Sequence, residues 1–220
     1  MKGRSFRVGR KVWLAVGAGL CMVAVVILPT GQAEDKQPFH IKGMYVEGCS
    51  CSRPCACQLT GLESGCQGVY GLALASGTYQ GTSLAGVKIA YGLGAGKWLR
   101  VYLDVPKGNQ REAAANFAKA YGKMFGPVEA VKDAKVAIDG KDGKYTLTVD
   151  GGKVLKLVTE PVLGGDGKRP LMYSNIHDPL HSTVMQGASV SCTFNDGGHS
   201  FELKDSNAYF NGKIDTKGEL

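Results

Sequence analysis

Short runs of β-favouring residues, separated by glycine-bearing turns, recur from residue 40 onward and restrict the fold more than any other feature of this sequence. Runs rich in Val, Ile, Tyr and Leu and bounded by such turns are typical of antiparallel strands, and Asp-Gly pairs are typical of tight hairpins. The runs lie at 40–48, 68–79, 84–93 and 97–105, the Asp-Gly turns at 139–140, 142–143 and 150–151, a loop at 161–183, and a terminal hairpin at 188–196 and 199–214.

One segment has a different period. Between residues 109 and 125, apolar side chains recur every three or four positions, which is typical of an amphipathic helix. Asn109 is placed to cap its start, and Gly126-Pro127 ends it. Because strands precede and follow a single helix, we predict an α+β fold. It would be a mostly antiparallel β-sheet or barrel-like domain with one main helix at about 109–125 and a cysteine-rich N-terminal loop.

The first residues have the pattern of an export signal. Five basic residues and no acid lie in residues 2–11, and an uncharged apolar run follows at 12–28. The small residues Gly31 and Ala33 then precede Glu34, as at a signal-peptidase site. We therefore predict a signal peptide at 1–33 and a single cysteine-rich domain at 34–220. The alternative is a retained membrane anchor; both readings predict a periplasmic or otherwise extracytoplasmic location.

Removal of this leader changes the charge of the chain. Five of the 26 lysines and arginines belong to it, so the remaining 21 face 19 acidic residues and the net charge falls from +7 to +2. A nucleic-acid-binding protein is expected to cluster its basic residues on one face or in a motif. Here both signs are interspersed, so we predict no nucleic-acid partner.

Four cysteines crowd into nine positions, "CSCSRPCAC" at residues 49–57, and a fifth follows at Cys66. In extended backbone the two members of a C-x-C pair point to the same face. Pro54 favours a bend between the pairs and could bring the second pair back over the first. Converging thiolates select soft ions such as Cu(I) or Zn(II). The candidate metal ligands are Cys49, Cys51, Cys55, Cys57 and Cys66.

Two other readings of the cysteines stay open. Cys192 gives an even number beyond the leader, which is the ordinary mark of disulfides in an exported chain. A reactive thiol pair is the third reading, although no C-x-x-C motif of the thioredoxin type occurs. A C-x-C spacing is awkward for an internal disulfide, and it also differs from the C-x(2–4)-C pairs of structural zinc sites.

Other chemistry-bearing residues give weaker signals. His177 and His181 are four residues apart, but Pro179 lies between them and argues against a shared helical face. We expect both to be solvated loop histidines. No serine lies in a G-x-S-x-G turn, and no glycine-rich phosphate loop opens the helix. A hydrolase or a nucleotide-dependent enzyme therefore has no support, and we expect binding rather than catalysis.

The segment "GMYVEGCSCSRPCAC", followed by "SGCQGVYGLALASGTYQGTSLAG", resembles the bacterial domain-of-unknown-function family numbered 1326. The resemblance covers most of residues 34–220, and the five cysteines carry its specificity. It implies a shared cysteine site but no reaction, because that family has no established activity. Two departures are Ala56, where the family has proline between the second pair, and the lack of a histidine soon after Cys66.

These observations lead to one functional hypothesis and two alternatives. The hypothesis is an exported protein that binds or handles a soft metal, with copper favoured over zinc, and that exchanges the ion with a membrane or periplasmic metal-handling protein. The first alternative is a non-catalytic structural or ligand-binding domain stabilised by disulfides. The second is a thiol-disulfide redox protein.

Overall fold

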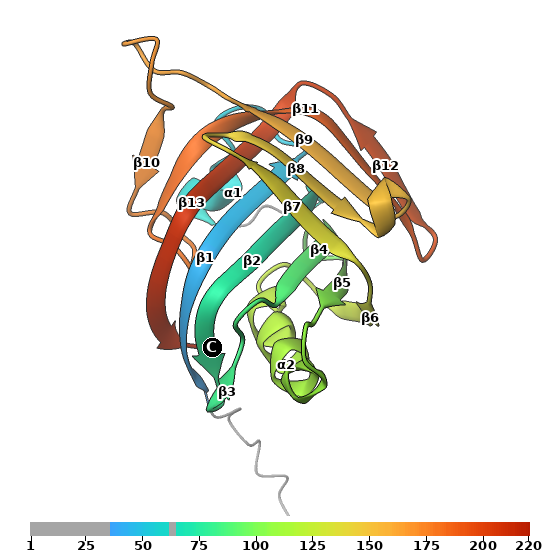
Figure 1. Ribbon diagram of the computed structural model, residues 1–220. Coiled ribbons are helices and arrows are strands. Elements are labelled where there is room, and N and C mark those ends of the chain that lie inside the picture. Colours follow the sequence, from blue (N-terminus) through green and yellow to red (C-terminus); the bar gives the residue numbers. More distant parts are fainter. Residues whose placement is uncertain (1–35, 62–64) are drawn as a thin grey trace, which may run out of the picture. The chain divides into compact units, whose positions relative to one another are not determined.

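The computed structural model describes residues 36–61 and 65–220. The predicted signal peptide at 1–33 lies outside the described residues. The described chain is mostly β, with an antiparallel-rich sheet curled into a half-barrel and one main helix (Figure 1), which confirms the predicted α+β class.

The bounds of the elements follow the predicted runs closely. The helices are α1 (Ala56–Thr60) and α2 (Arg111–Gly122), with 3-10 turns at Gly108–Gln110 and Asp150–Gly152. The strands are β1 (Pro38–Cys49), β2 (Gln67–Tyr79), β3 (Thr82–Ser83), β4 (Lys88–Gly94), β5 (Trp98–Asp104), β6 (Val128–Asp133), β7 (Val136–Lys141), β8 (Lys144–Val149), β9 (Leu155–Pro161), β10 (Met172–Ser174), β11 (Thr183–Asp196), β12 (His199–Leu203) and β13 (Ser206–Glu219).

The strands form a continuous ladder in the order β6-β5-β4-β2-β1-β13-β11-β9-β8-β7. The first pair, β5 and β6, is parallel, and the chain crosses between them through α2, as a parallel connection requires. β3 pairs with β2, while β10 and β12 both pair with β11. β1 therefore lies in the middle of the sheet, between β2 and β13.

Each face of the sheet packs its own hydrophobic core. On β1 the alternation separates Tyr45 and Cys49, which join the core that includes α2, from Val46, which joins the core that includes β8 and β9. Gly48 also points to the second core, where an added Cβ would lie 2.5 Å from a methyl carbon of Leu157. A side chain at residue 48 would therefore require the Leu157 side chain to move.

Four local expectations need correction. Asp139-Gly140 is part of strand β7 and not a turn, and the hairpin turns at Asp142-Gly143 instead. The helix starts at Arg111, after a 3-10 turn, and its N-cap residue is Gln110 without a side-chain capping bond, rather than Asn109. The predicted loop at 161–183 contains the short strand β10. The predicted hairpin arm at 199–214 is divided into β12 and β13 by a turn in which Asp205 has a positive φ of 49°.

No helix in the described ranges has both the length and the apolarity needed to cross a membrane.

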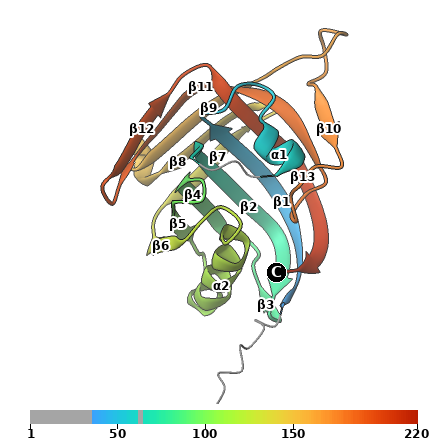
Figure 2. The same ribbon diagram turned by 180° about the vertical axis from the view of Figure 1, so that it is seen from behind.

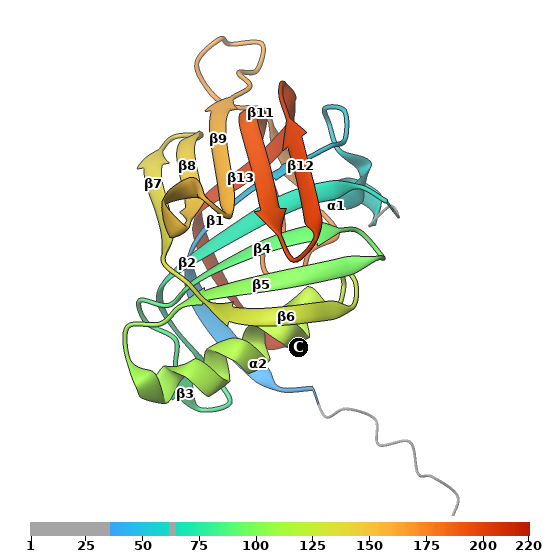
Figure 3. The same ribbon diagram turned by 90° about the vertical axis from the view of Figure 1, so that its right-hand side faces the viewer.

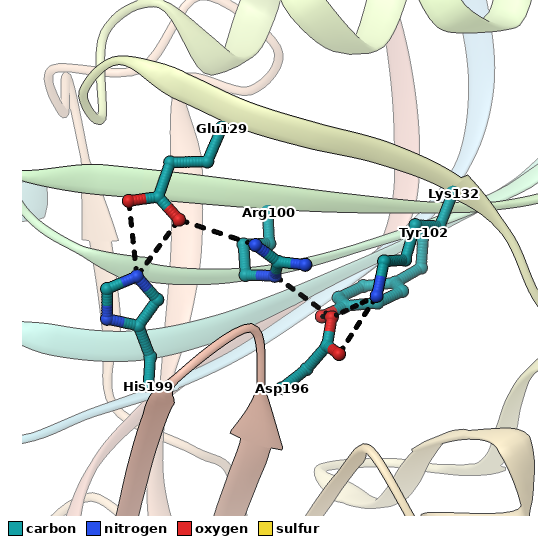
Figure 4. A network of polar contacts seen from close by, with 6 residues as sticks. All are labelled: Arg100, Tyr102, Glu129, Lys132, Asp196 and His199. Atoms are coloured by element: carbon teal, nitrogen blue, oxygen red, sulfur yellow. Dashed lines mark hydrogen bonds and ion pairs between the residues drawn. The ribbon is translucent and has the colours of Figure 1, made fainter.

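A polar network joins the turn between β11 and β12 to strands β5 and β6, which are not their neighbours in the ladder (Figures 3 and 4). The Asp196 carboxylate accepts hydrogen bonds from Arg100 Nε at 2.9 Å, Tyr102 Oη at 2.8 Å and Lys132 Nζ at 2.9 Å. Burial alone would raise the pKa of Asp196, but these donors outweigh it and lower that pKa to about 2. The network therefore closes the curled sheet with an ionised carboxylate.

His199, at the start of β12, makes a second set of contacts with β5 and β6. Its ring stacks on Trp98 with centroids 4.0 Å apart, and its Nε2 lies 2.9 Å from the Glu129 carboxylate. Glu129 also pairs with Arg100 at 3.4 Å, so the two sets of contacts form one network across β5, β6, β11 and β12.

Substitution of Asp196 by Asn should lower the free energy of unfolding by roughly 1.5–3 kcal/mol at pH 7, the usual range for hydrogen bonds to charged groups. Because the folded-state pKa is depressed, this stabilisation is present above the ordinary carboxyl pKa of 3.8 and is lost as the pH falls toward 2. The difference between variant and wild type should therefore shrink with acidification. Urea denaturation at pH 7, 4 and 2.5 measures it.

The exposed Asp139 on β7 offers a matched control, and Asp139→Asn should change stability by less than about 0.5 kcal/mol. An Asp196→Asn variant as stable as this control would show that the network does not hold the sheet closed.

Candidate metal centre

The site begins at the C-terminal end of β1, where alternate residues point to one face. Tyr45, Glu47 and Cys49 all lie on this face and are buried, with Cys49 only 2 % exposed. Cys49 is held between Gly68 of β2 and Asn207 of β13, and Asn207 Nδ2 donates to its sulfur at 3.5 Å. The first cysteine is thus fixed by the sheet itself.

The second pair of cysteines belongs to α1. Cys55 is the N-cap residue of this helix, and its carbonyl accepts a hydrogen bond from the Tyr209 hydroxyl at 3.1 Å. Cys57 lies in the first turn and is buried. The expectation of extended backbone at this pair is wrong, because α1 turns the chain here. Figure 2 shows α1 beside β13 and β10, in a different part of the sheet from α2.

The fifth cysteine, Cys66, comes immediately before β2 and is tied to the residue that follows Cys49. Ser50 N donates to Gln67 O at 2.8 Å, and Gln67 N donates back to Ser50 Oγ at 3.0 Å. The same Ser50 hydroxyl donates to Cys66 Sγ at 3.6 Å. This exchange of hydrogen bonds holds Cys66 next to the loop that carries Cys51.

The five sulfurs form two groups that share Cys51. In one group the Sγ atoms of Cys49, Cys51 and Cys55 all lie within 4.8 Å of one another, and in the other the same holds for Cys51, Cys57 and Cys66. The Sγ atoms of Cys51 and Cys66 are 3.1 Å apart, and those of Cys51 and Cys57 are 3.9 Å apart. The structure thus brings together all five cysteines singled out in the sequence.

Exposure divides this cluster. Cys51 and Cys66 are partly exposed, whereas the other three cysteines of the cluster are buried. Solvent therefore reaches the two groups through Cys51 and Cys66.

Cys192 does not join this cluster. It lies on β11 between Leu157 of β9 and Leu203 of β12, and it is buried in the core on the other face of the sheet. Burial raises the pKa of its thiol to about 12, so this thiol stays protonated and unreactive. The even number of cysteines therefore does not correspond to six sulfurs in one place, and the described residues contain no disulfide.

The clustered thiols shift one another's ionisation. Hydrogen bonds from the Cys49 thiol outweigh the effect of burial and lower the pKa of Cys55 to about 6 and that of Cys66 to about 5. The pKa of Cys49 rises in return, because its thiol is the shared donor. The lowered pKa values of Cys55 and Cys66 favour the thiolate, which is the form that binds metals and attacks disulfides.

A buried carboxyl group lies beneath the cysteines, and the sequence analysis did not single it out. Glu47 is fully buried, and its Oε2 accepts hydrogen bonds from the Tyr45 hydroxyl and, at 2.9 Å, from Gln58 Nε2. Gln58 also donates to the Tyr45 hydroxyl at 2.8 Å and comes from α1, so this triad fastens α1 to β1. Burial raises the pKa of Glu47 to about 8. Glu47 lies in a predicted strand, two residues before Cys49, and this spacing could have indicated that both side chains point to the same face.

The histidine expectation is half wrong. His177 is exposed, as predicted, but His181 is 3 % exposed and its ring packs on Tyr45 with centroids 4.3 Å apart. Burial lowers the pKa of His181, so the ring is neutral at pH 7. Asp178, whose carboxylate accepts from the Tyr121 hydroxyl at 2.9 Å, lies 3.7 Å from His181 Nε2. Sequence spacing alone did not indicate that this loop folds inward over the sheet.

Comparisons with known proteins give limited information. No protein-family model and no curated protein matches the chain. Among solved structures, the enduracididine biosynthesis enzyme MppR aligns over 94 % of this chain and 98 % of its own, with 14 % identity and a TM-score of 0.42. An acetoacetate decarboxylase aligns over 84 % and 89 % with 9 % identity, and the Legionella pneumophila enzyme over 89 % and 93 % with 6 % identity, each at a TM-score of 0.38. Similarity at this level carries nothing about activity to this chain.

Glu47→Gln should change how stability depends on pH. The unfolded chain ionises this carboxyl near its ordinary pKa of 4.5, so the wild type loses stability as the pH rises from about 4.5 to 8, while the glutamine variant does not. Each unit of pKa difference corresponds to roughly 1.4 kcal/mol. The variant should therefore gain on the wild type between pH 5 and pH 9.

Urea denaturation of the reduced, metal-free proteins at both pH values measures this gain. The thiols titrate in both proteins, so the difference between them isolates Glu47. Glu160→Gln, at an exposed position on β9, is the control and should show the wild-type pH profile. Parallel profiles for Glu47→Gln and wild type would contradict a buried, neutral carboxyl group.

Proposed function

We propose that this is an extracytoplasmic protein that binds and hands on a soft metal ion through the thiolates of its cysteine cluster. The ligands are Cys49, Cys51, Cys55, Cys57 and Cys66. The observation that carries the proposal is the convergence of these five sulfurs into two groups, each with its atoms mutually within 4.8 Å. Sulfurs bound to one ion at about 2.3 Å are separated by at most roughly 4.6 Å, so small movements would bring each group into coordination.

The donor set favours copper over zinc. In the part of the chain that the structure describes, both groups consist of sulfur alone, without histidine or carboxylate. Soft thiolates select Cu(I) and Zn(II), and Cu(I) accepts the low coordination number that three sulfurs provide. Structural zinc sites take four ligands, which neither group supplies by itself.

Partial exposure supports a role in transfer rather than in permanent storage. Cys51 and Cys66 reach the surface while Cys49 and Cys55 lie beneath them. A metal-handling partner in the membrane or the periplasm could replace the exposed ligands first and take the ion in steps. We infer the extracytoplasmic location from the leader predicted at 1–33.

The resemblance to the domain-of-unknown-function family numbered 1326 belongs to the same proposal. The five cysteines on which the resemblance depends are the ones that converge in the structure. Glu47, which belongs to the matching segment "GMYVEGCSC", is the buried carboxyl group beneath them. This supports a common site for proteins that carry the motif.

One observation favours a second candidate, the thiol-disulfide redox protein. The Sγ atoms of Cys51 and Cys66 are 3.1 Å apart, and both residues are partly exposed. A disulfide between them would need only a small approach and would remove Cys51 from both groups. The disulfide-stabilised structural domain is the remaining alternative, and it requires these thiols to be oxidised in every molecule.

Anaerobic titration with Cu(I) against a chromophoric Cu(I) chelator tests the proposal. Wild type should compete with the chelator and develop sulfur-to-copper charge-transfer absorption. The double variant Cys51→Ser/Cys55→Ser should weaken binding at least about 100-fold, since loss of an outer-shell partner alone costs up to that much. Cys192→Ser is the matched control, because this thiol lies outside the cluster, and it should bind as the wild type does.

Protein purified from its own compartment without reductant supplies the contrary outcome. Four of the five cluster cysteines joined in disulfides in every molecule, with no metal retained and no competition for Cu(I) after reduction, would refute metal binding. A single Cys51–Cys66 disulfide that exchanges with a small thiol would favour the redox candidate instead.

A further inference from the structure

We propose that the cysteine cluster is a dinuclear centre, with one ion bound by Cys49, Cys51 and Cys55, a second bound by Cys51, Cys57 and Cys66, and Cys51 bridging the two. This inference rests on the soft-metal function proposed above. It adds the number of ions, the assignment of ligands to each ion, and a distinct role for one cysteine.

The distances exclude one site made of all five sulfurs as they lie. Each group is mutually within 4.8 Å, but the two groups do not merge at that limit, and Cys51 is the sulfur that belongs to both. An ion at about 2.3 Å from its ligands cannot reach sulfurs that lie much more than roughly 4.6 Å apart. A single ion in either group therefore leaves two thiols of the other group unbound.

Charge supports filling both groups. Two like charges about 4 Å apart repel each other even at the effective dielectric constant near a protein surface. Cys51 lies 3.1 Å from Cys66 and 3.9 Å from Cys57, so ionisation of these thiols for metal binding crowds negative charge around Cys51. A cation in each group offsets this repulsion, and a bridging thiolate places its charge between the two ions.

Each group also has its own outer hydrogen-bond donor. Asn207 Nδ2 donates to Cys49 Sγ at 3.5 Å, and Ser50 Oγ donates to Cys66 Sγ at 3.6 Å. Such partners orient the ligands of metal centres and tune their basicity. The donors bind the terminal sulfurs Cys49 and Cys66, one in each group, and Cys51 lies between the two groups.

The elements that carry the groups explain how both are held. The first group joins the end of β1 to the N-cap of α1, and the second joins α1 to the start of β2. Two hydrogen bonds hold α1 against the sheet: Gln58 of α1 donates to Glu47 of β1, and Tyr209 of β13 donates to the Cys55 carbonyl. The two ions would therefore bind to one preformed frame built from three elements.

Native mass spectrometry of the reduced protein with Cu(I) supplied anaerobically from a weak chelate gives a direct count. Wild type should hold two ions. Cys49→Ser and Cys66→Ser should each hold one, because each removes a terminal ligand of one group. Cys51→Ser should hold none under the same conditions, and Cys192→Ser should hold two.

X-ray absorption of the copper-loaded wild type provides a second measurement that needs no variant. A dinuclear centre should give a copper–copper scattering shell in addition to the sulfur shell. One ion per chain with all five thiols protected from alkylation, or two ions retained in folded Cys51→Ser, would overturn the dinuclear assignment but leave the soft-metal function standing. No bound ion in wild type would instead refute that function.

Discussion

The pairing of β1 with β2 on one side and β13 on the other is the constraint on which the site depends. Because side chains alternate along a strand, a shift of register by one residue would turn Tyr45, Glu47 and Cys49 toward the opposite core. The bulge at Gly43 contributes to setting this register: its Cα lies so close to β2 that an added Cβ would be 2.2 Å from the Ala73 carbonyl oxygen. The register of β1 therefore determines the positions of both Glu47, which is buried under the cysteines, and Cys49, the first ligand of the cluster.

Features encoded by neighbouring residues could be predicted from the sequence, and features made by distant residues could not. The strands and α2 follow from local periodicity, and the convergence of the cysteines follows from their spacing and the bend at Pro54. Nothing local indicates that Asp196 meets Arg100, 96 positions away, or that Cys192 faces a different core from Cys49. Such partners are fixed by the order of strands in the sheet, which no short segment encodes.

The helical conformation around Cys57 depends on both neighbouring and distant residues. A five-residue helix has almost no intrinsic stability in water. Hydrogen bonds to other parts of the fold hold α1 in place. The side chain of Gln58 donates to Glu47, and the backbone carbonyl of Gln58 accepts from His177 N at 2.9 Å. The Tyr209 hydroxyl donates to the Cys55 carbonyl. The C-x-C spacing alone is compatible with extended backbone, whereas in the fold these tertiary contacts stabilise a helical turn at Cys57.

The ends of the ladder have a consequence for how the protein behaves when it is concentrated. Among the strands that the structure describes, β6 has a partner on one side only, and it carries Glu129, Lys132 and Asp133 on exposed positions. Charged side chains at the margin of a sheet discourage a strand from another molecule from adding to it. The same residues that fasten β6 to its own chain therefore also protect the edge of the sheet against edge-to-edge aggregation.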